Sequence, residues 1–251
     1  MPTRLCGAGK QCYLMASAYV FLFFPDTDIP LKDCKDIQDS GLTTSGLYTI
    51  NLRDGNGEFT VFCDMTLLGG GWTVIQRRID DKLDFEKNWD EYVHGFGNFN
   101  ENFWLGLDKI KRITDMGTYE LYIGLENFYT TGQITAWSKY ATFSLGSAAS
   151  NYPLTIGTYN TTSTAGDSLG SHSGEAFSTK DKDNDSHQTE HCSQTYKGGW
   201  WYKNCHDSNL NGKWYNNGVL ADPNVADGII WDDWISETYS LKTSVISVRK
   251  V

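Results

Sequence analysis

Carboxylates, cysteines and histidines that could support chemistry are concentrated between residues 181 and 206. Asp181, Asp183 and Asp185 alternate with other residues, so on an extended or looping backbone their side chains can point to one side. Calcium binds several oxygen ligands at about 2.3–2.6 Å and combines carboxylates with backbone carbonyls. The spacing therefore predicts a calcium (Ca2+) site. The segment is not an EF-hand, because it lacks the Gly after the third acidic position and the Glu that closes such a loop.

Two other interpretations of this segment stay open. An acidic run in a soluble protein is often only a solvated loop, which would bind no ion. His187, His191 and Cys192 together suggest zinc, although the sequence lacks the second half of a zinc site. Calcium is favoured over both.

The first 33 residues have the pattern of a leader. Basic residues at the start are followed by an apolar run over 13–24, which is typical of a secretory signal peptide, here followed by a short linker. An uncleaved anchor and a buried N-terminal strand are the alternatives. Cleavage would remove Cys6 and Cys12 with this segment. We expect the remaining domain to be secreted and extracellular, without membrane insertion.

The other four cysteines form an even set that suits an oxidising compartment. Cys205 follows Cys192 closely enough in the chain to be its disulfide partner, and that bond would close a small loop. The expected pairs are Cys34 with Cys63 and Cys192 with Cys205.

Composition limits the class of protein. With 251 residues and 39% hydrophobic content, the chain can bury a substantial core as one large domain or two small ones. A net charge of −10 repels phosphate, so we expect no nucleic-acid partner and no attraction to anionic membranes. Cationic partners and metal ions fit this charge.

Most of the chain reads as scaffold made of strands, turns and short helices. Asp54-Gly55-Asn56-Gly57 predicts a hairpin turn, because Gly and Asn accept the positive φ of tight turns. Asn160 begins a glycosylation sequon within a polar segment that we expect to be a long surface connection, residues 151–173. Hydrophobic periodicity predicts strands over 47–52, 59–65, 72–78, 119–125, 141–145 and 239–251, and helices over 88–94 and 108–114.

Several motifs occur in a fixed order from Cys34 to the C-terminus. They are Gly46-Leu47-Tyr48, Phe62-Cys63-Asp64-Met65, Gly70-Gly71-Trp72-Thr73-Val74-Ile75-Gln76-Arg77-Arg78, Phe103-Trp104-Leu105-Gly106, the acidic segment, Gly199-Trp200-Trp201-Tyr202, Asn204-Cys205-His206 and Ser208-Asn209-Leu210-Asn211-Gly212. Together they resemble the fibrinogen-related domain, the C-terminal globular domain of fibrinogen. Within that family the chain looks most similar to the lectin branch of ficolins and tachylectins.

This resemblance implies one α+β domain over residues 34–251. It would contain an N-terminal subdomain pinned by a disulfide, a central, mainly antiparallel sheet with short helices, and a loop-rich C-terminal subdomain that holds the sites. The resemblance also implies that calcium binds the side chains of Asp183 and Asp185 and the backbone carbonyls near His187 and Thr189.

The lectins of this family recognise acetyl groups beside the ion. Carried onto this sequence, Tyr196 and His206 match pocket positions, and Asn204-Cys205 matches a cis peptide. Val225 and Ala226 match the pocket wall, with Val225 where an aromatic residue is common. A further departure is Glu237, at another position where an aromatic wall is common.

The expected function is therefore calcium-dependent, lectin-like recognition of acetylated carbohydrates or glycoconjugates, of the kind used in innate immune recognition. Weak single sites would require several copies, so we also expect a homo-oligomer. The main alternative is a protein-binding or structural fibrinogen-like module, which the departures at Val225 and Glu237 favour slightly. An enzyme is not expected, because His206, Asp207 and Ser208 are merely adjacent in sequence and no nucleophile motif such as Gly-x-Ser-x-Gly is present.

Overall fold

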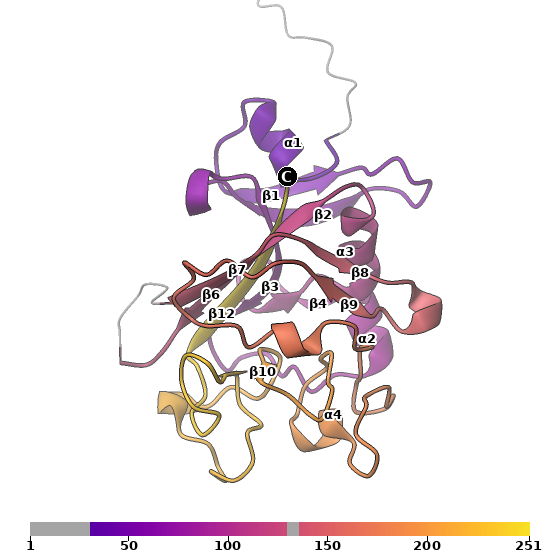
Figure 1. The fold of residues 1–251 in the computed structure, drawn as a ribbon. Coiled ribbons are helices and arrows are strands. Elements are labelled where there is room, and N and C mark those ends of the chain that lie inside the picture. Colours follow the sequence, from indigo (N-terminus) through magenta and orange to yellow (C-terminus); the bar gives the residue numbers. More distant parts are fainter. Residues whose placement is uncertain (1–30, 130–135) are drawn as a thin grey trace, which may run out of the picture.

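A computed structural model describes residues 31–129 and 136–251 of the chain (Figure 1). The expected leader and its two cysteines lie outside these residues, apart from positions 31–33. The helices are α1 (Cys34–Asp39), α2 (Trp89–His94), α3 (Leu107–Thr114) and α4 (Cys192–Thr195), with single 3-10 turns at Leu67–Gly69, Ala148–Ser150, Gly170–His172 and Asn216–Gly218. The strands are β1 (Gly46–Ile50), β2 (Phe59–Asp64), β3 (Trp72–Arg78), β4 (Phe96–Gly97), β5 (Phe103–Trp104), β6 (Tyr119–Glu126), β7 (Ala136–Tyr140), β8 (Phe143–Leu145), β9 (Leu154–Ile156), β10 (Ser208–Asn209), β11 (Ile230–Trp231) and β12 (Thr243–Lys250).

A twisted antiparallel sheet organises the fold, which confirms the expected α+β class. Its strand order is β1-β2-β3-β12-β6-β7, with β5 pairing β3 and β4 pairing β5. The expected C-terminal strand begins at Thr243 rather than Tyr239, and it lies between β3 and β6 in the middle of the sheet. Its pairing with β6 runs from Thr243 opposite Glu126 to Lys250 opposite Tyr119.

The N-terminal hairpin forms as the sequence predicts and is covalently pinned. Strands β1 and β2 pair antiparallel from Ile50 opposite Phe59. The Cys34–Cys63 disulfide joins the start of α1 to β2 across a Cα–Cα distance of 5.3 Å. Asp33 caps α1 by accepting from the backbone N–H groups of its first turn, and it also accepts from the Tyr119 hydroxyl at 2.6 Å. The helix is thus tied to both β2 and β6.

The helices are short and serve packing. The longest, α3, buries Leu107, Ile110 and Ile113, which confirms the predicted core-facing helix. Within residues 31–129 and 136–251, no helix has the length and apolar character needed to cross a membrane.

The polar segment 151–173 is not the surface connection that its composition predicts. Leu154, Ala165 and Leu169 are buried in the main core, and residues 154–156 form β9 against β8. The indole N–H of Trp231 donates to the Ala165 carbonyl at 2.9 Å. A few buried apolar residues anchor this Ser-, Thr- and Gly-rich segment to the core. Their irregular spacing gives no hydrophobic periodicity from which the sequence could predict this.

The C-terminal part contains few regular elements and depends on an aromatic core. Trp200 and Trp201 are 0% and 2% exposed, which confirms that they are packing residues first. Trp201 packs edge-on against Phe177 with ring centroids 5.1 Å apart. Figure 1 shows these orange and yellow loops gathered at one end of the sheet, opposite α1. The loops that form the candidate site are therefore held by rings rather than by a ladder of backbone bonds.

One buried hydroxyl joins this aromatic core to α2. The Tyr92 hydroxyl donates to the Phe85 carbonyl at 2.7 Å and accepts from the Gly199 N–H at 3.0 Å. We expect Tyr92→Phe to lower the free energy of unfolding by about 1–3 kcal/mol, because it leaves the buried Gly199 N–H without a partner, whereas the Phe85 carbonyl still accepts from the Lys87 N–H. Urea denaturation measures this. Tyr129→Phe is the control, since Tyr129 is 79% exposed, and equal stability of the two variants would contradict the role of the Tyr92 hydroxyl.

Candidate functional site

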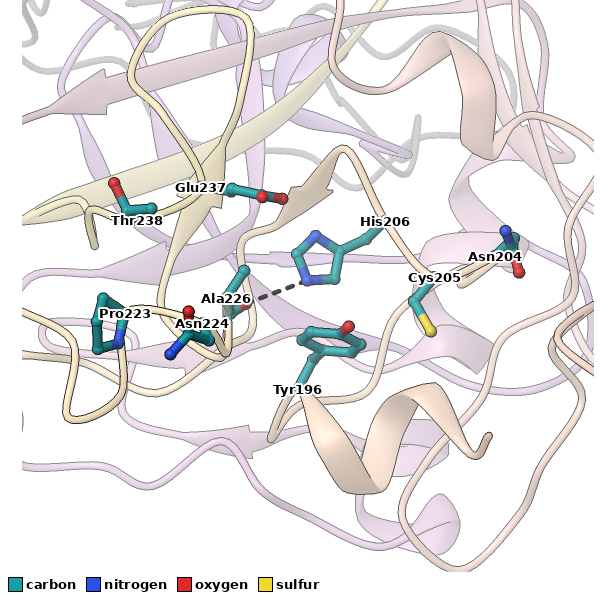
Figure 2. Close-up of a pocket in the computed structure, with 9 residues that line it drawn as sticks. All are labelled: Tyr196, Asn204, Cys205, His206, Pro223, Asn224, Ala226, Glu237 and Thr238. Carbon is teal, nitrogen blue, oxygen red and sulfur yellow. Dashed lines mark hydrogen bonds between the residues drawn. The ribbon is translucent and has the colours of Figure 1, made fainter. Parts of the chain in front are cut away.

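A pocket of about 470 Å³ opens among the C-terminal loops (Figure 2). The sequence pointed to five of the residues that line it, namely Tyr196, Asn204, Cys205, His206 and Ala226. Glu237, noted in the sequence only as a departure, also lines it. The remaining lining residues, Pro223, Asn224 and Thr238, were missed. Val225 does not line the pocket, although its chain neighbours Asn224 and Ala226 both do.

The backbone around Cys205 is held from several directions. The Asn204–Cys205 peptide is cis, and Cys205 forms a disulfide with Cys192. The Lys203 N–H donates to the Cys205 carbonyl at 2.9 Å, and the Ser186 N–H donates to the Lys203 carbonyl at 3.1 Å. Among the described residues, none accepts a hydrogen bond from the N–H groups of Cys205 or His206. Both residues line the pocket, and their backbone donors have no partner within the described part of the chain.

His206 forms a neutral, oriented wall of the pocket. Its Nε2 lies 3.1 Å from the Ala226 carbonyl, which can only accept, so Nε2 carries the hydrogen and Nδ1 is an acceptor. Nδ1 is buried and has no partner among the described residues. Burial lowers the pKa of His206 to about 3, with a smaller contribution from His172. The Tyr196 ring packs edge-on against the imidazole at 4.5 Å.

Glu237 places a negative charge at the pocket rim. Its side chain is exposed, and its backbone N–H donates to the Asp232 carboxylate at 3.1 Å. Figure 2 shows the carboxylate directed toward the side of the pocket that holds the His206 ring. Burial, followed by the charges of Glu190 and Glu237, raises the pKa of Tyr196. The Tyr196 hydroxyl therefore stays protonated and can donate.

Trp214 and Tyr215 do not fill the place of the missing aromatic wall. The Trp214 indole donates to the Lys242 carbonyl at 2.9 Å, and the Tyr215 hydroxyl donates to the Asp227 carboxylate at 2.9 Å. Both side chains support the loops behind the pocket.

The acidic segment leads directly into the pocket backbone. Asp185 accepts from the His187 N–H with one carboxylate oxygen and from the Cys192 N–H with the other, each at 2.9 Å. Asp183 accepts from the Asp185 N–H at 3.2 Å. Burial raises the pKa of Asp185, and the neighbouring Asp183 carboxylate raises it further. A cation placed between these two close carboxylates would offset the repulsion between their charges.

The residues present fit a calcium ion better than zinc. The carbonyls of His187 and Thr189 accept no hydrogen bond from any described residue, so they can join Asp183 and Asp185 as oxygen ligands. Within the described ranges, no three His, Cys, Asp or Glu side chains cluster as a metal site, so backbone oxygens would have to complete the shell. The zinc interpretation fails because the Cys192 sulfur is in a disulfide. The calcium site itself stays a prediction.

Asp181 does not join the other two acidic residues, contrary to the alternation argument. Its carboxylate accepts from the Trp89 N–H at 2.8 Å and from the Thr179 hydroxyl at 2.7 Å. It therefore tethers the acidic segment to the start of α2.

The two sequons differ in their surroundings. Asn160 sits in a turn in which its side-chain oxygen accepts from the Thr162 N–H and hydroxyl, and glycosylation there stays a prediction. A second sequon, Asn184-Asp185-Ser186, lies in the acidic segment, and its Asn184 amide nitrogen donates to the Phe177 carbonyl at 2.7 Å.

The adjacent residues His206, Asp207 and Ser208 do not form a catalytic triad. His206 bonds to Ala226, while the Asp207 carboxylate accepts from the Ser171 hydroxyl at 2.5 Å. The Ser208 hydroxyl is buried and has no partner among the described residues. The geometry provides recognition groups rather than an activated nucleophile.

The acidic segment gives a prediction for ion binding. We expect calcium at about 100 times its dissociation constant to raise the free energy of unfolding by about 2.7 kcal/mol. Asp185→Asn should lose most of this gain, because it removes a ligand charge between the ion and the Cys192 backbone. Thermal unfolding with calcium and with chelator measures it. Asp81→Asn, an exposed carboxylate elsewhere, should keep the full gain, and an undiminished calcium effect in Asp185→Asn would refute the site.

The buried histidines predict a pH dependence. Burial lowers the pKa of His172 as well as that of His206. Below about pH 6.5 the unfolded chain gains protons that the native chain does not, so stability falls as the pH decreases, by about 1.4 kcal/mol per pH unit for each such histidine. In urea denaturation between about pH 7 and pH 5, His206→Gln should show a shallower fall than wild type. His94→Gln, at an exposed site, should not, and identical slopes would argue against a neutral His206.

Comparison with known proteins agrees with this architecture. Residues 30–251 match the family model described as fibrinogen beta and gamma chains, C-terminal globular domain. Fibrinogen C domain-containing protein 1 of Xenopus tropicalis is 46% identical over 223 residues, covering 87% of this chain and 47% of that protein. Tenascin-R of Gallus gallus is 46% identical over 219 residues, covering 87% of this chain and 15% of that protein.

Solved structures give the same result. The fibrinogen-like globe domain of human ANGPTL2 has a TM-score of 0.83 at 38% identity, covering 88% of this chain and 99% of that chain. Lamprey fibrin D-dimer, complexed with the peptide Gly-His-Arg-Pro-amide, has a TM-score of 0.79 at 34% identity, covering 86% of this chain and 72% of that chain. The chain spans about half the length, or less, of the curated relatives it matches. It belongs to the family of fibrinogen C-terminal globular domains.

Proposed function

We propose that this domain recognises acetyl groups on extracellular carbohydrates or glycoconjugates through the pocket at Tyr196 and His206. The observation that carries the proposal is the pair of unpaired N–H groups on Cys205 and His206, two residues that line the pocket together with the small apolar side chain of Ala226. An acetyl oxygen would accept from these donors while its methyl group packs against apolar atoms. This is the lectin-like use of the fold.

Calcium would support this recognition from outside the pocket. An ion held by Asp183 and Asp185 would neutralise two carboxylates, one of which bonds the Cys192 N–H. Cys192 is joined by its disulfide to Cys205, whose N–H faces the ligand in this proposal. The ion would therefore fix the position of the recognition backbone without touching the ligand.

The setting we propose is extracellular, because both disulfides need an oxidising compartment. A single open pocket binds a small sugar weakly, so we also propose that several copies act together. Light scattering on the purified chain measures this, and a sharp monomer at the concentrations that retain ligand would remove the oligomer from the proposal.

A protein-binding role is the second candidate. The peptide complex of the lamprey fibrin D-dimer concerns a relative with the same fold, and Glu237 gives this pocket a carboxylate suited to a basic peptide. In that case calcium would be structural only.

The test is binding of the full chain to immobilised N-acetylglucosamine, with calcium or chelator and with free acetylated sugar or acetate as competitor. We expect retention that requires calcium and is released by the acetylated competitors. Tyr196→Ala and His206→Ala should each weaken binding about tenfold, because each removes a pocket wall. His94→Ala is the control at an exposed site outside the pocket lining.

Retention unaffected by acetylated competitors would contradict acetyl recognition. If the chain retains no sugar while calcium still raises its melting temperature, the second candidate is favoured, and Gly-His-Arg-Pro-amide is the first peptide to titrate.

A further inference from the structure

One residue that lines the pocket has no part in acetyl recognition. Glu237 carries the only carboxylate among the lining residues, and the lining contains no Lys or Arg. Among the described residues, none forms a hydrogen bond or an ion pair with its side chain. The pocket therefore presents one negative charge that the domain itself leaves unbalanced.

His206 does not supply the missing positive charge. Its Nε2 hydrogen is used by the Ala226 carbonyl, and burial keeps the ring neutral. The second ring nitrogen, Nδ1, is an unpartnered acceptor. Because Nδ1 is buried, the exposed Glu237 carboxylate is the acceptor on this side of the pocket. A complementary ligand group must donate hydrogens to it, and a positively charged donor fits it best.

The surrounding loops strengthen this bias. Residues 204–241 contain six Asp or Glu residues and one lysine, Lys213. The Lys213 ammonium lies over the Tyr215 ring, 5.0 Å from its centroid, and neither residue lines the pocket. Asp222 and Asp232 accept backbone N–H groups of Asn224 and Glu237, so they shape the rim without being neutralised by a cation. Between Lys203 and Lys242, these loops therefore carry more negative than positive charge.

The donors and the acceptors of the pocket belong to different parts of one site. The N–H groups of Cys205 and His206 suit an acetyl oxygen, whereas the Glu237 carboxylate suits an ammonium group. A volume of about 470 Å³ lies in the range of pockets that hold a ligand larger than a lone acetyl group. A ligand with an acetamide and a nearby ammonium would use both parts.

We propose, on the basis of the acetyl recognition proposed above, that the pocket selects partly deacetylated amino-sugar chains, in which an N-acetylated residue adjoins a residue with a free amine. The acetamide binds the Cys205 and His206 amides, and the neighbouring sugar ammonium binds Glu237. Glu237 is thus a specificity-determining residue. It makes the pocket prefer an acetylated sugar that has a free amine on its neighbour over one whose neighbour is also acetylated.

The size of the expected preference follows from the exposure of Glu237. An exposed carboxylate–ammonium pair changes affinity by about two- to fivefold, because water screens much of the attraction. Added salt should reduce the preference, since the Debye length falls to about 8 Å at physiological ionic strength. Contacts of the acetyl group are uncharged and should change little with salt.

The experiment titrates the full chain, with calcium, with two glucosamine disaccharides at about pH 6, where the sugar amine is protonated. One disaccharide is fully N-acetylated, and the other carries one acetamide and one free amine. We expect the monoacetylated form to bind about two- to fivefold more tightly at low salt. In Glu237→Gln the two forms should bind with equal affinity. Glu58→Gln removes an exposed carboxylate from the distant β1–β2 hairpin and should keep the preference.

The possible failures can be told apart. Equal affinity for the two disaccharides in the wild type overturns the role of Glu237 while leaving acetyl recognition intact. A preference that persists in Glu237→Gln also overturns it. If neither disaccharide binds but Gly-His-Arg-Pro-amide binds in a Glu237-dependent manner, both sugar proposals fail and the carboxylate serves a peptide ammonium.

Discussion

The candidate site depends on the two hydrogen bonds that Asp185 accepts from the His187 and Cys192 backbones. One oxygen of this carboxylate organises the acidic loop, and the other reaches the residue whose sulfur is bonded to Cys205. The acidic segment, the Cys192–Cys205 disulfide and the backbone at Cys205 and His206 are therefore one connected unit. This arrangement places the half-buried Asp185 carboxylate beside that of Asp183. Burial, and then the neighbouring carboxylate, raises the pKa of Asp185. A cation bound to both carboxylates would offset this repulsion next to the hydrogen bond that joins Asp185 to Cys192.

Beneath this unit, packing of the aromatic core holds the loops in place, as regular secondary structure does elsewhere in the chain. Elements β10 and β11 contain only two residues each, so they contribute few backbone bonds. Large rings such as Trp200 and Trp201 instead bury extensive apolar surface, and their burial is worth more to stability than an exposed polar contact. This arrangement lets the loops above vary in sequence while their base stays fixed. A pocket-lining residue such as Glu237 could therefore set the selectivity that we propose without a change of fold.

The sequence predicted the fold well wherever a local signal was strong. The Asp54–Gly57 turn, the amphipathic spacing through Ile110 and Ile113, and the alternation over 119–125 each specify an element by themselves. The family motifs also brought Tyr196, Cys205 and His206 together, which no periodicity could do. Pro223 and Thr238 were missed because their positions depend on how irregular loops fold back, and such loops carry no pattern. Asp181 was misplaced for a related reason, since alternation in sequence does not specify direction once the backbone turns.

The position of β12 has a consequence for how the chain acquires its structure. This strand joins β3 to β6, so residues 72–78 and 119–126 are not directly paired and meet only through residues 243–250. During synthesis, β3 and β6 both emerge before β12, so their edges that face it stay unpaired until residues 243–250 are made. Contacts across such long sequence separations form slowly, and unpaired strand edges attract other chains. Secretion would place this vulnerable interval in a compartment where the disulfides that pin each end can form at the same time.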